Sequence, residues 1–146
     1  MTNGSSTPGQ AAARDAQAVS AARQELKRQF VSFALVGVVG TITHYATMLS
    51  LIEFAGATPV MGTFAGFFAG LGASYVLNRQ WTFDKRPPWA RGFATYFAVC
   101  FVGLGINMGI VALALAIHVH FMIGQVVATC VALFWNFLSS KFVVFR

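Results

Sequence analysis

Polar side chains inside long apolar stretches are the residues of this 146-residue sequence best suited to hold a ligand. Each is costly in a lipid bilayer unless it finds a partner. Counting the helical rise along the stretches places them in a basic inner tier and a neutral outer tier. The inner tier contains Ser74, Asn78, Arg79, Asn136, Ser140 and Lys141, and the outer tier contains His44 and Asn107. Such groups can hold a polar or anionic ligand, and His44 could also carry a proton.

Each of these residues also has a purely structural interpretation. Arg79 and Lys141 could extend their charged ends to the membrane surface as anchors. Asn78 and Asn136 could join neighbouring helices by hydrogen bonds. His44 could be a packing residue with a partner of its own. At this point both interpretations remain open.

Catalysis is not expected from this sequence. The acidic residues lie outside the apolar stretches or at their ends: Asp15, Glu25, Glu53 and Asp84. General acid–base chemistry therefore lacks a pair of carboxylates, and no phosphate-binding loop for a nucleotide is found. Cys100 and Cys130 lie within apolar stretches, where we expect small buried side chains and no disulfide. The sequence thus predicts no enzymatic activity, no cofactor and no metal site.

Four apolar stretches position the polar residues: Phe30–Phe54, Val60–Trp81, Phe93–Ile117 and Phe121–Val144. Each reaches the ~20 residues that a helix needs to cross a bilayer. The chain is 57% hydrophobic and 10% charged, so a water-soluble fold of this size could not hide its apolar surface. The expected fold class is an all-α membrane protein with four transmembrane helices.

The basic residues indicate the orientation. All ten lie before the first stretch, between the end of the second and the start of the third, or at the end of the fourth. Because positive residues stay on the cytoplasmic side, both termini and the loop at Lys85 are expected in the cytoplasm. The net charge of +6 lies beside the stretches, so it suits anionic lipid head groups and not nucleic acid.

Residues 1–28 are expected to form a cytoplasmic tail, and residues 29–146 the transmembrane domain. Met1–Gln10 is rich in Gly, Ser, Thr and Pro, which is typical of disorder, and it lacks the apolar segment of a secretory signal. Ala11–Gln29 contains good helix formers. It is expected either to lie on the membrane as an interfacial helix or to act as a solubilising tail.

The two halves of the transmembrane domain match each other when Phe30 is aligned with Phe93. The pairs are Phe33 with Tyr96, Gly40 with Gly103, His44 with Asn107, Ser74 with Asn136, Tyr75 with Phe137, Asn78 with Ser140, Arg79 with Lys141 and Phe83 with Phe145. This indicates duplicated helical hairpins, arranged as parallel repeats about an axis along the membrane normal. We therefore expect His44 and Asn107 to face each other across that axis.

Small residues predict where helices pack. Gly62, Gly66 and Gly70 recur at every fourth position, and Gly105 and Gly109 repeat that spacing in the third stretch. Such strips let backbones approach closely, which favours helix association in lipid. They indicate either packing within one chain or the face of a homodimer.

The sequence resembles the GtrA-like family from about Phe30 to Arg146. The matching features are an opening of the form F-x-x-F-x-x-x-G-x-x-G and a polar, aromatic, basic and Phe signature that ends each half. Residues 74–83, SYVLNRQWTF, look like the N-R-x-W-T-F segment of that family. Residues 136–145, NFLSSKFVVF, are a looser version with Ser-Lys in place of Asn-Arg, and His44 stands where the family often has an acidic or amide residue.

The resemblance implies a translocase, or flippase, for lipid-linked sugars in the cytoplasmic membrane of a bacterium. Its substrate would be a polyprenyl-phosphate monosaccharide used in cell-surface polysaccharide synthesis, and its partners membrane glycosyltransferases. Arg79 and Lys141 are then expected at the phosphate, which a guanidinium can hold with two parallel hydrogen bonds. The residues expected at the sugar are Ser74, Asn78, Asn136, Ser140, His44, Asn107 and Trp81.

Two other functions remain open. A small multidrug or cation exporter should carry a carboxylate in the middle of a span, whereas Glu53 lies at the outer end of the first one. A membrane adaptor that anchors a polyprenyl-phosphate glycosyltransferase would fit the sequence equally well. A transport assay in liposomes separates the translocase from the adaptor.

Overall fold

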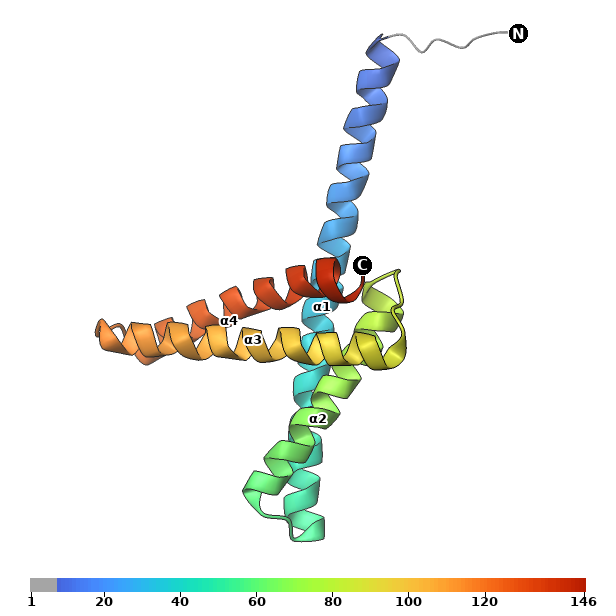
Figure 1. The fold of residues 1–146 in the computed structure, drawn as a ribbon. Coiled ribbons are helices and arrows are strands. Elements are labelled where there is room, and N and C mark those ends of the chain that lie inside the picture. Colours follow the sequence, from blue (N-terminus) through green and yellow to red (C-terminus); the bar gives the residue numbers. More distant parts are fainter. Residues whose placement is uncertain (1–7) are drawn as a thin grey trace.

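The computed structural model describes residues 8–146, and over this range it contains only helices and loops (Figure 1). The long helices are α1 (Pro8–Ala55), α2 (Pro59–Leu77), α3 (Trp89–Ala116) and α4 (Phe121–Ser139). Five-residue π-helical turns, η1 (Asn78–Thr82) and η2 (Ser140–Val144), extend α2 and α4. Four helical segments are long and apolar enough to cross a membrane, as the sequence predicted. The chain is therefore an all-α, multi-pass membrane protein.

Helix α1 extends well beyond the first apolar stretch. It begins at Pro8, where a proline suits the first turn, and continues into the span without a break. Glu25 accepts hydrogen bonds from Arg28 Nε (2.8 Å) and Gln29 Nε2 (2.7 Å), and the bond from Arg28 lowers the pKa of the Glu25 carboxyl. Residues 8–28 thus form a helical extension that projects away from the other helices (Figure 1). Disorder was expected for Met1–Gln10, but residues 8–10 form the first turn of α1, and residues 1–7 lie outside the described residues.

The first hairpin packs α2 tightly on α1. Gly56 begins the connection after α1 with a φ of 64°, which glycine adopts without strain. Thr58 Oγ1 caps α2 by accepting from the Met61 amide at 3.3 Å. A Cβ atom added at Gly66 would lie 2.5 Å from the backbone oxygen of His44, and one at Gly70 would lie 2.5 Å from the backbone oxygen of Gly40. These glycines therefore pack within the chain.

The second hairpin uses other glycines than expected. Gly103 faces the Asn136 side chain, and a Cβ at Gly124 would lie 2.6 Å from the Ala114 Cβ. Around Gly105 and Gly109, no atom of the described chain lies within 4 Å of an added Cβ, apart from their own helix and neighbours. These two glycines have the spacing of a packing strip, but they do not pack on another helix of the described chain.

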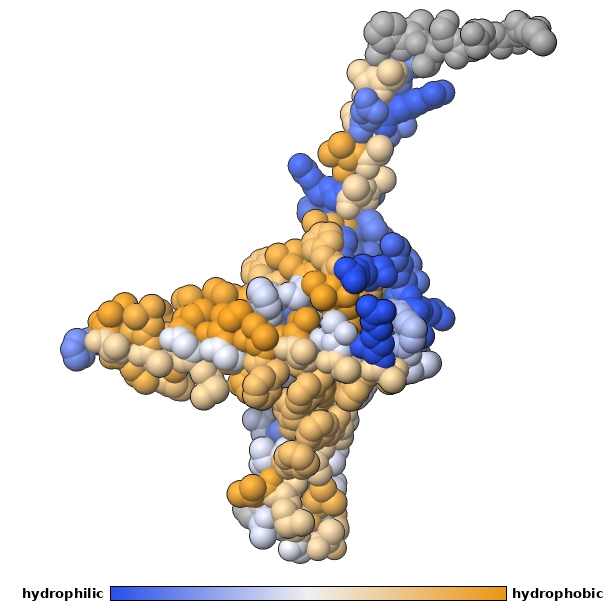
Figure 2. All heavy atoms as spheres, in the orientation of Figure 1, coloured by the Kyte–Doolittle hydropathy of each residue, from blue (hydrophilic) through white to orange (hydrophobic). Residues whose placement is uncertain are grey.

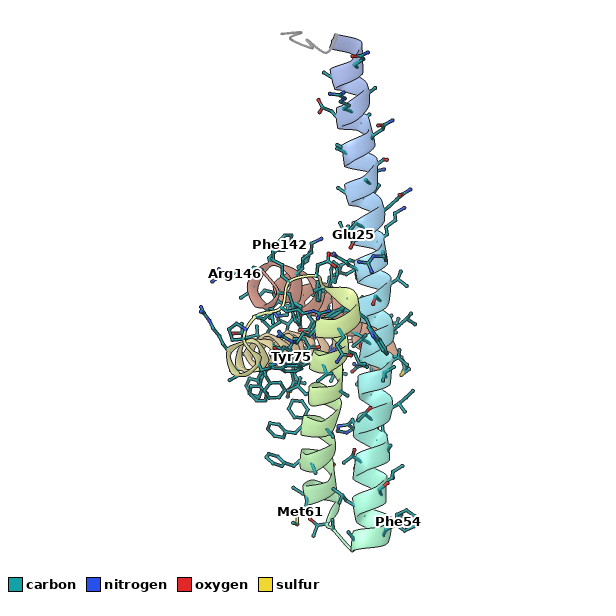
Figure 3. All side chains as sticks on the ribbon, turned by 90° about the vertical axis from the view of Figure 1, so that its right-hand side faces the viewer. Glu25, Phe54, Met61, Tyr75, Phe142 and Arg146 are labelled. Atoms are coloured by element: carbon teal, nitrogen blue, oxygen red, sulfur yellow. The ribbon has the colours of Figure 1, made fainter. Side chains whose placement is uncertain are left out.

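The two hairpins cross instead of running side by side as a bundle. Figures 1 and 3 show α3 and α4 leaving the first hairpin steeply at the ends where Tyr75 and Arg146 lie, while Phe54 and Met61 mark the far tip of the first hairpin. An aromatic cluster fills the crossing, with members Phe33, Tyr75, Phe83, Tyr96, Phe137 and Phe145. The Phe83 and Phe145 rings stack with centroids 4.7 Å apart. Beyond the crossing, the apolar side chains face outward, as suits lipid (Figure 2).

The expected meeting of His44 and Asn107 within one chain is wrong in this structure. His44 lies on α1 and Asn107 on α3, and these helices do not pack on each other anywhere in the described residues. Equal depth in two parallel hairpins would have placed the side chains opposite each other. Because the hairpins diverge from the crossing, residues of equal depth move apart along them.

Candidate functional site

A cleft of about 400 Å³ lies between the two hairpins beside their crossing. Its polar lining consists of Thr41, His44, Tyr45, Ser74, Tyr96 and Asn136. Three of these were predicted from the sequence, namely His44, Ser74 and Asn136. Each comes from a different helix, α1, α2 and α4, so the cleft forms only when the hairpins are assembled. It offers hydroxyl, amide and imidazole groups to a ligand in the membrane, without any charged side chain.

Two glycines hold the polar side chains of the cleft in place. The Ser74 Oγ atom occupies the space beside Gly40, and the Asn136 Oδ1 atom occupies the space beside Gly103. A Cβ at either glycine would overlap these atoms, so only glycine allows the polar groups to lie this close to the facing backbone. The two arrangements match between the hairpins as a duplication would produce, and the duplication itself stays a prediction.

The predicted signature segments both adopt π-helical turns. The amide of Phe83 donates to the Asn78 carbonyl oxygen at 3.0 Å, and the amide of Phe145 donates to the Ser140 carbonyl oxygen at 2.9 Å. Such i→i+5 turns are rare and occur frequently at functional sites. In this chain η1 follows the cleft residue Ser74, and η2 follows the cleft residue Asn136. Each π-helical turn leads directly to a phenylalanine of the aromatic cluster, Phe83 or Phe145.

Several buried polar atoms near these turns have no hydrogen-bond partner in the described chain: Asn78 Oδ1, Asn136 Oδ1 and Ser140 Oγ. The Asn78 amide nitrogen does donate to the Tyr96 hydroxyl at 3.2 Å, which links η1 to the wall of the cleft. Unpartnered buried polar atoms are costly, and native proteins keep few of them. Asn136 is the one of these residues that lines the cleft, where its buried Oδ1 atom lies against Gly103 without a hydrogen-bond partner.

The basic pair predicted from the sequence is not brought together. The Arg79 guanidinium donates to the Pro87 carbonyl oxygen and lies 4.5 Å from the Trp89 ring centroid. Lys141 instead lines a separate cavity of about 360 Å³. Both residues lie at the crossing, but neither lines the cleft. Trp81 points outward from η1 with 63% of its surface exposed, so it does not line the cleft either.

A second hollow, about 640 Å³ in volume, continues from the cleft along α2 and α3. His44 and Phe67 line both spaces, which places them at the junction. The other walls are nearly all apolar, and five phenylalanines line it: Phe64, Phe67, Phe68, Phe97 and Phe101. This phenylalanine groove can accept a long hydrocarbon chain while the cleft accepts a polar group.

Sequence reasoning missed the phenylalanine groove and three polar cleft residues, Thr41, Tyr45 and Tyr96. The signal for Tyr96 was present, because its expected match in the first half is the apolar Phe33. A hydroxyl at only one of two matched aromatic positions indicates a hydrogen-bonding role in that half of the chain and not in the other. The groove had no comparable signal, since phenylalanines occur throughout the apolar stretches. Asn107, predicted for the sugar, is half-buried on α3 and lines neither the cleft nor the groove.

Comparison with known proteins agrees with this architecture. The chain is 30% identical over 118 residues to the prophage bactoprenol-linked glucose translocase homolog of Escherichia coli (strain K12), covering 80% of this chain and 94% of that protein. It is 29% identical over 118 residues to the bactoprenol-linked glucose translocase of Shigella phage SfX, with the same coverage. Residues 32–145 match the family described as GtrA/DPMS, transmembrane domain. That match reaches into all four spans and includes the residues of the cleft, and the chain therefore belongs to the GtrA/DPMS transmembrane domain family.

Proposed function

We propose that this protein moves a polyprenyl-phosphate-linked monosaccharide across the cytoplasmic membrane of a bacterium. The observation that carries the proposal is the polar cleft joined to the phenylalanine groove through His44 and Phe67. Such a substrate combines a sugar, a phosphodiester charge and an isoprenoid tail, and the two hollows match its polar and apolar ends. The relatives named as bactoprenol-linked glucose translocases support this substrate class.

In this proposal the cleft lowers the cost of moving a sugar through lipid. Sugar hydroxyls lose water on entering the membrane, and that loss is costly unless other hydrogen bonds replace it. Ser74, His44 and Asn136 line the cleft and supply such bonds. The tail stays in the phenylalanine groove and in the surrounding lipid, so only the polar head has to cross.

The phosphate is proposed to start at the basic end of the protein. Arg79, Lys141 and the loop at residues 83–88 lie at the crossing, and the far tip of the first hairpin at Phe54 carries no basic residue (Figure 3). Arg79 has N–H donors beyond the one bonded to Pro87, so it keeps the capacity to bind an anion.

A glycosyltransferase that uses the delivered sugar is the proposed partner. The open face at Gly105 and Gly109 is available to the proposed homodimer.

Reconstituted protein should accelerate the transfer of lipid-linked glucose between leaflets. The purified chain is placed in liposomes whose inner leaflet contains labelled polyprenyl-phosphate glucose, and periodate outside the liposomes oxidises only sugar that reaches the outer leaflet. We expect oxidation at least 10-fold faster than in protein-free liposomes. An equal rate with folded protein would contradict the translocase and favour the adaptor.

Topology reporters should place the basic end in the cytoplasm. Fusions after Arg14, within Asp84–Arg91 and after Arg146 are expected to report a cytoplasmic position, and one at Ala57 an external position. The reason is the retention of Lys and Arg on the cytoplasmic side. An external result for the loop between α2 and α3 would contradict the proposed direction of transport.

A further inference from the structure

A third hollow, about 350 Å³ in volume, lies at the crossing between the start of α3 and the end of the chain. Its walls include Arg91 and Thr95 from α3 and Arg146 beyond η2. Thr95 and Tyr96 are neighbours in α3, but the first lines this cavity and the second lines the cleft. The two spaces therefore open on different faces of α3.

The side chains that line this cavity carry a net positive charge. No acidic side chain lines it, and among the described residues the one ion pair joins Glu25 to Arg28. Arg146 also lines the neighbouring cavity around Lys141, whose walls include Asp84 and Lys85, whereas Arg91 lines only the first of the two cavities. Two arginines facing one polar space without a carboxylate favour an anion.

The rim of the cavity is held firmly. Pro87 and Pro88 form part of its wall, and Arg79 donates a hydrogen bond to the Pro87 carbonyl oxygen. Gly92 is buried against the Tyr75 hydroxyl and the Pro87 ring, so no larger side chain fits there. Arg91, the neighbour of Gly92, thus projects from a fixed backbone, which reduces the entropy lost when it binds a ligand.

We propose that this cavity binds a phosphate group, with Arg91 and Arg146 as its charged ligands. Each planar guanidinium can present two N–H donors to phosphate oxygens. The cavity would then hold the phosphate of the lipid at the cytoplasmic surface before the sugar enters the cleft. This role rests on the proposed function, whereas the binding of phosphate rests on the cavity alone. Arg79 acts on it through the position of Pro87.

Binding measurements in nanodiscs test the site. Wild-type protein in phosphatidylcholine nanodiscs is titrated with three probes in turn: polyprenyl-phosphate glucose, phosphatidylglycerol and inorganic phosphate. Arg91→Gln and Arg146→Gln should each weaken the binding of the preferred probe about 10-fold or more, which is typical for loss of a charge-assisted hydrogen bond. Arg91→Lys keeps the charge without the planar fork, so it should keep part of the affinity.

Arg86→Gln is the matched control, because it removes the same charge from the loop just before α3 and lines neither this cavity nor the one around Lys141. It should change affinity less than about twofold, as expected for an exposed charge that does not line the cavity. Equal losses in all three glutamine variants would overturn the site and leave only general surface charge. Failure of the wild type to bind any probe would overturn it as well.

The probes also identify the source of the phosphate. A preference for polyprenyl-phosphate glucose supports a substrate site, equal binding of phosphatidylglycerol supports a site for any lipid phosphate, and binding of inorganic phosphate supports a soluble ligand.

The liposome assay separates this inference from the proposed function. If the wild type transports the lipid-linked sugar but Arg91→Gln and Arg146→Gln bind the probes as tightly as the wild type does, the site is overturned and the proposed function is not. Phosphate binding without any transport by the wild type would overturn the function alone.

Discussion

Asn136→Leu is expected to slow transport of the lipid-linked sugar about 10-fold while the protein stays folded. Asn136 lines the cleft, and its buried Oδ1 atom has no partner in the described chain, so the amide can turn toward a sugar hydroxyl without breaking a hydrogen bond. Loss of one hydrogen bond to the sugar in a dry site has about this effect on rate. Because the oxygen is unpartnered and leucine is similar in size, the substitution leaves no new unsatisfied group and should not lower stability. The periodate assay measures the rate.

Asn107→Leu is the matched control for this experiment. It makes the same chemical change on α3 at a residue that lines neither the cleft nor the groove. We expect its transport rate to stay within about twofold of the wild type, since no bond to the sugar is lost. Equal losses in both variants would show that general polarity matters and not the cleft, and a normal rate for Asn136→Leu would exclude the cleft from the path.

Gly66→Ala and Gly70→Ala are expected to destabilise the first hairpin by about 1–3 kcal/mol each, the usual cost of overpacking. At both positions an added Cβ would lie 2.5 Å from a backbone oxygen of α1. Backbone atoms cannot rotate away as a flexible side chain can, so the two helices must separate. Unfolding in mixed micelles, followed by tryptophan fluorescence, measures the change in the free energy of unfolding.

Gly105→Ala and Gly109→Ala are the controls for this second experiment. Nothing else in the described chain lies within 4 Å of a Cβ at either position. Alanine is a better helix former than glycine, so these variants should be neutral or more stable by up to about 1 kcal/mol. A loss of stability at Gly105 or Gly109 that depends on protein concentration would instead place them in the interface of a homodimer. Unchanged stability for Gly66→Ala would contradict the close packing of α1 and α2.

The sequence by itself determined the four spans and located the glycine strip of α2, whereas the structure showed that this strip packs on α1. Spans can be recognised because each residue contributes its own free energy of transfer to lipid, and these contributions add along a helix. Three residues of the cleft, His44, Ser74 and Asn136, were also recognised in advance, since polar groups within apolar stretches need a reason to be there. The alignment of the two halves paired Ser74 with Asn136 and Gly40 with Gly103. In the structure Ser74 lies against Gly40, and Asn136 lies against Gly103.

Only the tertiary structure decided how the hairpins meet. It separated His44 from Asn107, bonded Arg79 to Pro87, and assembled the phenylalanine groove from α2 and α3. Lipid is as apolar as the helix surfaces, so hydropathy does not favour a bundle over a crossing. The choice depends on close packing between distant segments, here the aromatic rings of both hairpins at the crossing. Such contacts depend on the three-dimensional shapes of both hairpins, which cannot be read directly from the order of residues along the chain.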